Sequence, residues 1–256
     1  MQLFDTHIHL YAEEFEKDRP ALINKAISNG INRFYLPNID SASIKGMLDL
    51  EKQYPQQCFA MMGLHPCSVN NSVEDELKLV REWLNKRAFA GIGEIGLDLY
   101  WDKTYFKEQQ QAFASQIEWA LEFDYPIIIH VRNAFKETIE LLKTFKTLPR
   151  GIFHCFSGTL EEANEVLALG HFKLGLGGVL TFKNSGLDKV AQAIDIKHFV
   201  LETDAPYLAP VPFRGKRNEP SYILEVARKL AELKTLELDQ VAEITSKNAE
   251  EIFKKA

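Results

Sequence analysis

Cysteine is scarce in this sequence, and the few cysteines present form no pattern. The 256 residues include only Cys58, Cys67 and Cys155, and no C-x-x-C motif joins any two of them. A framework of disulfide bonds is therefore excluded, and we expect a reduced, cytoplasmic setting.

The sequence also lacks long apolar runs and an excess of positive charge. No stretch approaches the length of a membrane span, and the N-terminus has neither the basic segment nor the apolar run of a signal peptide. The net charge of −6 argues against a protein that coats nucleic acid through bulk charge, but it leaves room for a local phosphate site. We expect a soluble monomer without a membrane partner. The hydrophobic fraction of 46% is ample for a large core.

Strand and helix patterns alternate along the whole chain. Short apolar segments predict strands at residues 3–9, 31–37, 58–62, 89–94, 126–130, 151–155, 172–176 and 198–202. Helical spacing predicts helices at residues 13–30, 41–54, 73–86, 106–123, 134–145, 160–170, 187–194, 221–233 and 238–253. Because eight βα units fill this length without a linker, the sequence predicts one (β/α)8 TIM barrel over residues 1–256. The alternative is an open doubly wound sheet, which would bind its ligand at one switch point.

Residues that can bind metals gather at the ends of the predicted strands. His7 and His9 lie two positions apart in a predicted strand and so share a face. Taken alone, this motif is equally explained by a pair of hydrogen-bonded histidines without a metal. The polar residues at strand ends are His7, His9, His65, Glu94, His130, His154 and Asp204. In a barrel all of them lie at the C-terminal rim, where active sites are found. Four histidines with Glu94 and Asp204 would make a two-metal site with a bridging carboxylate.

Two other motifs do not predict a site. Residues 91–96 match G-x-G-x-x-G, but they lie mid-chain, open no helix and contain Glu94, so a dinucleotide site is rejected. We expect these glycines to let the backbone turn beside Glu94. Ser157 is not a nucleophile, because the surrounding residues lack G-x-S-x-G. His171 and His198 come at strand starts, where a structural or solvent-facing role is expected.

Seven ordered blocks resemble those of the TatD family of metal-dependent hydrolases, a branch of the amidohydrolase-like barrels. The blocks run from one end of the chain to the other: DTHIHL at 5–10, GLHP at 63–66, GEIGLD at 93–98, HVR at 130–132, HCFSG at 154–158, ETDAPYL at 202–208 and RGKRNEP at 214–220. The resemblance implies two divalent metal ions (Mg²⁺, Mn²⁺ or Zn²⁺) and the ligands His7, His9, Glu94, His130, His154 and Asp204. Glu94 would stand where related barrels use a modified lysine. Because the family includes Mg²⁺-dependent 3′→5′ exodeoxyribonucleases, the resemblance also implies action on DNA 3′ ends or another phosphodiester.

Catalytic roles can be assigned within such a site. Glu94 would bridge two cations roughly 3.5–4 Å apart, while Asp204 would bind one of them and accept the proton of the attacking water. His65 and Arg132 are candidates to hold phosphate oxygens, although a salt bridge from Arg132 to a ligand carboxylate is equally expected. Arg214 belongs to the densest basic cluster, for which a solvated loop is the default and nucleic-acid contact the alternative.

Further residues near the strand ends have supporting roles. Asp5 and Glu202 share strand parity with His7 and Asp204, so we expect them to point inward and support the ligands. The aromatic residues that follow the fourth strand could stack on bases, although covering the rim is their commoner use. They are Tyr100, Trp101 and Tyr105.

Two other functions stay open. The same metal centre could act as an amidohydrolase or carboxylic-ester hydrolase on a small molecule. A non-catalytic binding protein on a barrel scaffold is the third alternative, and the intact set of ligands argues against it.

Overall fold

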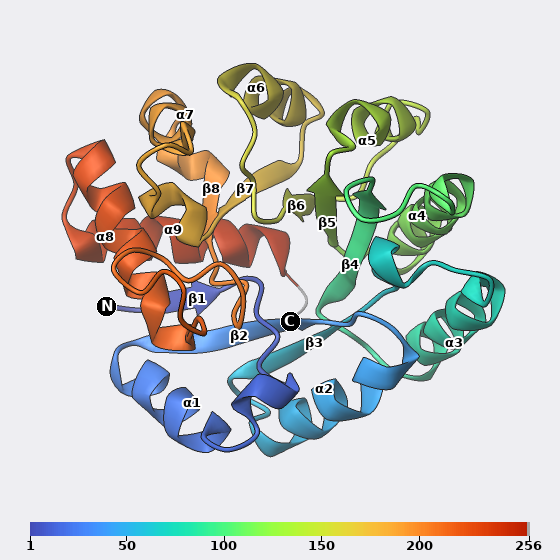
Figure 1. Cartoon of the computed structure of the whole chain (residues 1–256), viewed down its shortest axis with the longest axis horizontal. Coiled ribbons are helices and arrows are strands. Elements are labelled where there is room, and N and C mark those ends of the chain that lie inside the picture. The colour runs from blue at the N-terminus through green and yellow to red at the C-terminus, as the bar shows by residue number, and fades with distance from the viewer. Residues whose placement is uncertain (255–256) are drawn as a thin grey trace.

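The computed structural model, which describes residues 1–254, contains one sheet of eight parallel strands in sequence order (Figure 1). The strands are β1 (Leu3–Asp5), β2 (Ile31–Pro37), β3 (Cys58–Met62), β4 (Gly91–Asp98), β5 (Ile127–Arg132), β6 (Gly151–Phe153), β7 (Phe172–Leu176) and β8 (Phe199–Leu201). Just after the end of β1, the Thr6 amide donates to the carbonyl of Leu201, the last residue of β8, at 3.1 Å. This bond brings the first and last strands together and all but closes the sheet into a barrel.

Helices cover the outside of the strands, as Figure 1 shows. They are α1 (Arg19–Ser28), α2 (Ser41–Gln53), α3 (Val73–Lys86), α4 (Phe106–Phe123), α5 (Phe135–Leu142), α6 (Leu160–Ala168), α7 (Leu187–Ala193), α8 (Ile223–Lys234) and α9 (Leu238–Ile252). The (β/α)8 barrel predicted from the sequence is therefore confirmed. The assignment of residues 1–256 to a single domain stays a prediction, and its last two residues lie outside the described part of the chain.

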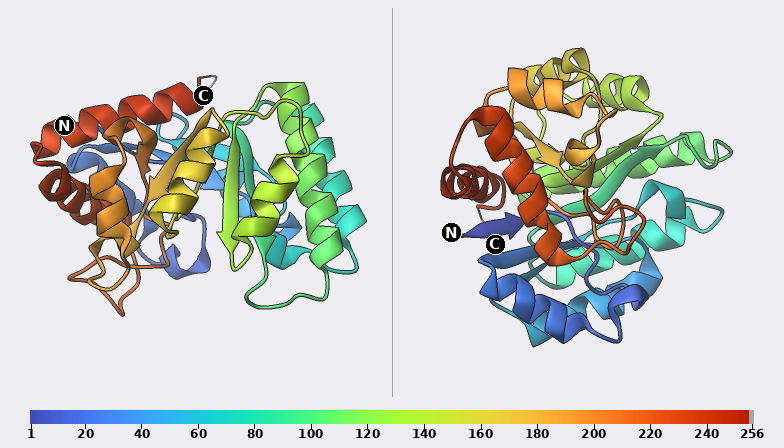
Figure 2. Two further views of the ribbon diagram at one scale, coloured as in Figure 1. Left: turned by 90° about the horizontal axis from the view of Figure 1, so that it is seen from above. Right: turned by 60° about the vertical axis from the view of Figure 1, so that its left-hand side comes forward.

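The end of the barrel at which the strands begin is filled by apolar side chains. Phe4, Tyr35 and Ile128 are buried there together with Phe253, and the Tyr35 and Phe253 rings stack with centroids 3.7 Å apart. Helix α9 lies across this end, as the left view of Figure 2 shows. The N-terminal end is thus closed by packing, and the opposite end is left for the site.

The ends predicted for the first and fourth strands are each wrong by four residues, whereas the other predicted strand ends differ from the structure by at most two. The first strand ends at Asp5 instead of residue 9, because the following amides leave the ladder: Ile8 bonds to the Tyr35 carbonyl and His9 to the Ala205 carbonyl. The fourth strand does not end at Glu94. It runs on to Asp98, since this part pairs with β5 through Asp98 and Arg132.

The helix predicted at residues 13–30 is split. A short 3-10 turn covers Glu13–Phe15, and α1 begins only at Arg19. Pro20 lies in the first turn of α1, the part of a helix where its missing N–H is tolerated. Among the helices of the described residues, none is both long and apolar enough to cross a membrane.

Candidate metal centre

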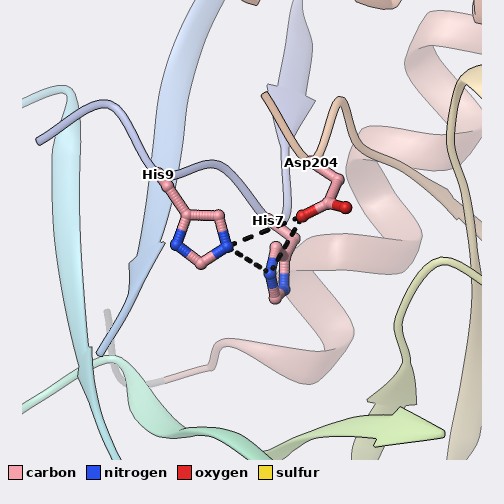
Figure 3. Close-up of side chains that lie close together, drawn as sticks. All are labelled: His7, His9 and Asp204. Carbon is pink, nitrogen blue, oxygen red and sulfur yellow. Dashed lines mark hydrogen bonds and ion pairs between the residues drawn. The ribbon is translucent and has the colours of Figure 1, made fainter. Parts of the chain in front are cut away.

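The rim of the barrel brings together the six residues predicted as ligands. His7 and His9 follow β1, and Asp204 follows β8, whose end lies beside them (Figure 3). The Nε2 atoms of the two histidines are 3.3 Å apart, and each lies 3.6 Å from Asp204 Oδ1. Two imidazole nitrogens and a carboxylate oxygen therefore face one small volume.

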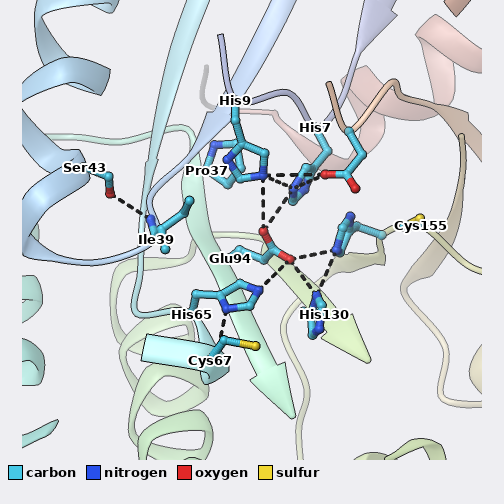
Figure 4. A network of polar contacts seen from close by, with 12 residues as sticks. His7, His9, Pro37, Ile39, Ser43, His65, Cys67, Glu94, His130 and Cys155 are labelled. Carbon is cyan, nitrogen blue, oxygen red and sulfur yellow. Dashed lines mark hydrogen bonds and ion pairs between the residues drawn. The ribbon is translucent and has the colours of Figure 1, made fainter. Parts of the chain in front are cut away.

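Glu94 lies at the centre of the cluster and divides its histidines into two groups (Figure 4). Its Oε2 is 3.1 Å from His7 Nε2 and 3.6 Å from His9 Nε2. Its Oε1 is 2.8 Å from His130 Nδ1, 2.8 Å from His154 Nε2 and 3.3 Å from His65 Nε2. One carboxylate thus presents a separate oxygen to each side of the cluster.

Glu94 reaches this position from within β4, not from its end. The register between β4 and β5 shifts between Ile92 and Ile95, and such irregularities re-aim side chains beside many active sites. The neighbouring glycines let β4 approach the backbone of β5 closely and do not form the turn predicted for them. Gly96 has a φ of +143°, and a Cβ added there would lie 2.0 Å from the His130 carbonyl oxygen.

Asp98 also belongs to the cluster, although it was not among the site residues predicted from the sequence. Its Oδ2 is 2.9 Å from His130 Nε2, while the Nδ1 of the same ring faces Glu94. His130 is therefore held between two carboxylates, which sets its orientation. The sequence does carry a signal for Asp98, because it follows Glu94 at an even spacing and so shares a face with it if both lie in one strand. A strand that ended at residue 94, as predicted, would not contain Asp98.

Glu202 and Asp5 have different roles, although both were expected to support the ligands. Glu202 Oε1 lies 3.6 Å from His154 Nδ1, and the same oxygen accepts a hydrogen bond from the Cys155 amide. Asp5 accepts hydrogen bonds from the Thr203 amide and hydroxyl and from the His7 backbone amide. Glu202 thus supports a ring of the cluster directly, whereas Asp5 ties the loop after β1 to the loop after β8.

The charges of the cluster stabilise one another. Burial opposes a charge on Glu94, but the surrounding His154, His65 and His7 outweigh it and hold the pKa of Glu94 well below its ordinary value. The pKa of His154 is raised well above its ordinary value despite burial, because Glu94 and Glu202 face it. The centre is therefore strongly polarised, with a carboxylate anion inside a ring of imidazoles.

His7, His65 and Asp204 keep the form that binds cations, whereas the pKa of His130 is raised despite its burial, because Asp98 and Glu94 face its two ring nitrogens. Burial lowers the pKa of His7 and of His65, which favours neutral imidazole. Burial opposes the charge on Asp204, but a hydrogen bond from His9 and the nearby His154 hold its pKa below the ordinary value. Asp5 differs, since burial raises its pKa well above the ordinary value and favours the neutral acid.

The donor atoms fit divalent cations. Within the described residues, three groups place one donor atom of each member within 4.8 Å of the others: His7, His9 and Asp204; His7, Glu94 and His154; and His65, Glu94 and His130. In the first group, two ring nitrogens point at each other and at a carboxylate oxygen, an arrangement that a shared cation satisfies. Imidazole nitrogens suit Zn²⁺, and carboxylate oxygens suit Mg²⁺ and Mn²⁺.

The residues predicted to hold substrate lie in different surroundings. His65 is part of the cluster through its contact with Glu94. Arg132 is exposed and stacks 3.8 Å from the ring centroid of Tyr100, and within residues 1–254 no carboxylate pairs with it. Arg214 is also exposed and stacks at 3.8 Å over Phe182, without a hydrogen bond or ion pair to the cluster in this part of the chain.

The predicted basic cluster around Arg214 is not a uniform surface. Arg217 makes two hydrogen bonds to the Asp18 carboxylate, at 2.9 and 2.6 Å, and its guanidinium also lies near Glu219. This arginine anchors the loop to the segment before α1. Lys216 and Arg214 are the members left exposed.

A cavity of about 450 Å³ opens beside the cluster, between the loops that follow β5 and β6. His154 and Cys155 line its inner side, Phe135 and Phe156 contribute aromatic rings, and Asn133 contributes an amide. Its size lies in the range of small-molecule sites.

A (β/α)8 barrel whose rim gathers five histidines around a buried glutamate defines a class, the metal-dependent hydrolases built on this fold. The family model described as "TatD related DNase" matches residues 4–254. This chain belongs to that family.

Individual relatives support this assignment, and their similarity to this chain extends over nearly the whole of both chains. The chain is 38% identical to the uncharacterized metal-dependent hydrolase YabD of Bacillus subtilis, over 98% of this chain and 99% of YabD. It is 31% identical to the 3′-5′ ssDNA/RNA exonuclease TatD of Pectobacterium parmentieri, over 99% and 100% of the two chains. The crystal structure of the TatD homologue YjjV from Escherichia coli superposes with a TM-score of 0.92, at 30% identity, covering 99% of this chain and 98% of that one.

Proposed function

We propose that this protein is a 3′→5′ exonuclease that cleaves single-stranded DNA with two divalent cations, acting as a monomer in the cytoplasm. The cations would be held by His7, His9, Glu94, His130, His154 and Asp204. One observation carries the two-cation part: Glu94 turns one oxygen to His7 and His9 and the other to His130 and His154. The substrate is inferred from the Pectobacterium relative, which is named as an exonuclease on single-stranded DNA and RNA.

The chain's own residues prepare the attack on phosphorus. Bound divalent cations would lower the pKa of a water molecule and offset the charge that develops on the phosphate oxygens. Asp204 is ionised and is the least buried of the three side chains in its group, so it accepts the proton of the attacking water as general base. Glu94 keeps the two halves of the site at a set separation. Asp98 and Glu202 hold the rings of His130 and His154 in place.

The substrate is held on the same rim. His65 and Arg132 would contact oxygens of the scissile phosphate, and Arg214 would contact the backbone farther along the strand. The cavity of about 450 Å³ beside His154 has room for one terminal nucleoside, with the rings of Phe135 and Phe156 against it. A strand with a free end can enter such a cavity, whereas the interior of a strand cannot.

The test is digestion of end-labelled single strands by the purified protein. After chelation and addition of Mg²⁺ or Mn²⁺, a 5′-labelled strand should shorten progressively, and a strand blocked at its 3′ end should resist. Measuring the metal content of the same sample checks for two ions per chain. Hydrolysis of a panel of esters and amides in the absence of any cleavage of DNA would contradict the proposal and favour the small-molecule alternative.

A further inference from the structure

Trp101 and Tyr100 are exposed at the rim to a degree that packing does not explain. Trp101 is 71% exposed and Tyr100 50% exposed. The chain's other two tryptophans, Trp83 and Trp119, pack against the core. Tyr105, in the same loop, also packs against the core, whereas Tyr100 and Trp101 belong to neither apolar cluster of the described residues. Covering the rim is therefore the role of Tyr105 and not of the two exposed rings.

Arg132 joins these two rings to form one surface. Its guanidinium lies 3.8 Å from the centroid of the Tyr100 ring and 5.2 Å from that of Trp101, and the two rings meet edge to face at 4.7 Å. We call Tyr100, Trp101 and Arg132 the aromatic platform. A cavity of about 170 Å³ adjoins the indole, so its surroundings are not filled.

The platform is tied to the metal centre through Asp98. The Tyr100 amide donates to Asp98 Oδ1 at 2.9 Å, while the other oxygen of this carboxylate contacts His130 Nε2. The Leu99 amide donates to the Arg132 carbonyl at 2.9 Å, which joins the ends of β4 and β5. The platform is thus held at a set distance from the site, as a surface that receives part of the same substrate must be.

We infer that the aromatic platform stacks on the bases of the single-stranded nucleic acid whose 3′ end lies at the metal centre, an inference that rests on the proposed function. Every base has a flat face, so aromatic stacking binds a strand without selecting its sequence. A guanidinium stacks on the same faces while its N–H groups stay free for phosphate. The chain's net charge of −6 repels a polyanion, so affinity must come from local contacts of this kind.

The inference is tested by binding without cleavage, in EDTA. The probes are a labelled oligothymidylate and a strand of the same length that lacks bases. The wild type should bind the oligothymidylate more tightly, with quenching of its tryptophan fluorescence. Trp101→Ala should weaken that binding about 5- to 150-fold and change binding of the baseless strand less than about twofold, because a stacked base contributes about 1–3 kcal/mol. Trp101→Phe, which keeps a ring, should lose less.

Trp119→Phe is the matched control. Trp119 lies on α4, where it packs against the core with the guanidinium of Arg81 5.9 Å from its ring. This variant should bind like the wild type and keep the quenching. Equal affinity of Trp101→Ala and wild type for oligothymidylate, or absence of quenching in the wild type, would overturn the inference. If the wild type binds through Trp101 but cleaves no DNA with Mg²⁺ or Mn²⁺, the proposed function fails and the stacking surface stands.

Discussion

The two ends of this barrel are made from the same strands and have opposite chemistry. At the N-terminal end the interior residues are apolar, and a few positions farther along the same chain segments the interior residues are ligand candidates. The pairs are Phe4 and His7, Ile128 and His130, Ile152 and His154, and Val200 and Asp204. Since a strand rises about 3.3 Å per residue, the environment changes within roughly 7–13 Å.

This contrast separates stability from function. Mutual attraction lets the histidines and carboxylates of the rim be buried, but it does not repay their full loss of hydration. The apolar end carries no such cost and is sealed by α9. We therefore expect changes at the rim to affect activity and changes at the apolar end to affect stability.

The largest effect is expected for Glu94→Gln. Glutamine keeps the shape of the side chain but removes the charge that faces both groups of histidines, so the two proposed cations should be lost. We expect kcat/KM to fall by more than about 10⁴-fold, beyond what a general base alone contributes, and the metal content to fall with it. Cooperative unfolding in denaturant should persist. A variant that retains two ions per chain would contradict the central position assigned to Glu94.

The next effect concerns two buried aspartates whose pKa values are shifted in opposite directions. Asp204→Asn should lower kcat by about 10²–10⁴-fold, because an amide cannot accept the proton of the attacking water. Asp5→Asn is its matched control. Burial raises the pKa of Asp5, which favours the neutral acid, and its carboxyl group contacts Thr203 and the His7 backbone amide instead of the cluster. An amide of the same shape should therefore lower kcat by less than about tenfold. Equal losses in the two variants would remove Asp204 from the proposed mechanism.

At the apolar end, Phe253→Ala should act on stability alone. Phe253 is buried against Tyr35, and removal of its ring leaves a cavity that should lower the free energy of unfolding by about 3–5 kcal/mol. Denaturant unfolding measures this loss, while kcat of the folded fraction should match the wild type. A large fall in kcat at unchanged stability would break the proposed separation between the two ends.

The smallest effects are expected in the basic loop. Replacing Arg214 and Lys216 by glutamine should flatten the salt dependence of binding to single strands by no more than about 0.7 per lost contact. Arg217→Gln should leave that slope unchanged and cost about 0.2–1 kcal/mol of stability, because this partly exposed arginine pairs with Asp18. If Arg217→Gln flattens the slope as much as the double variant does, its pairing with Asp18 is not its main role.

Much of this protein could be predicted from the sequence. The alternation of apolar strands with amphipathic helices predicts the barrel, because hydrophobic periodicity reflects which face of each element is buried. The position of His7, His9, His130 and His154 near strand ends predicts that they meet, since parallel strands in a barrel end at one rim. These inferences depend on local pattern and on general rules of topology, so they need no knowledge of contacts.

Only the tertiary structure decided how Glu94 divides the histidines into two groups and which neighbouring residues contact one another. Register between β4 and β5 decides that Glu94 lies within its strand and that Asp98 reaches His130. Asp204 has a left-handed φ of 56° and Cys155 one of 46°, conformations that non-glycine residues adopt only where their surroundings impose them. Likewise, the contacts with Asp18 and Glu219 distinguish Arg217 from its basic neighbours. Such features arise from residues far apart in the chain, and no local pattern encodes which of them will touch.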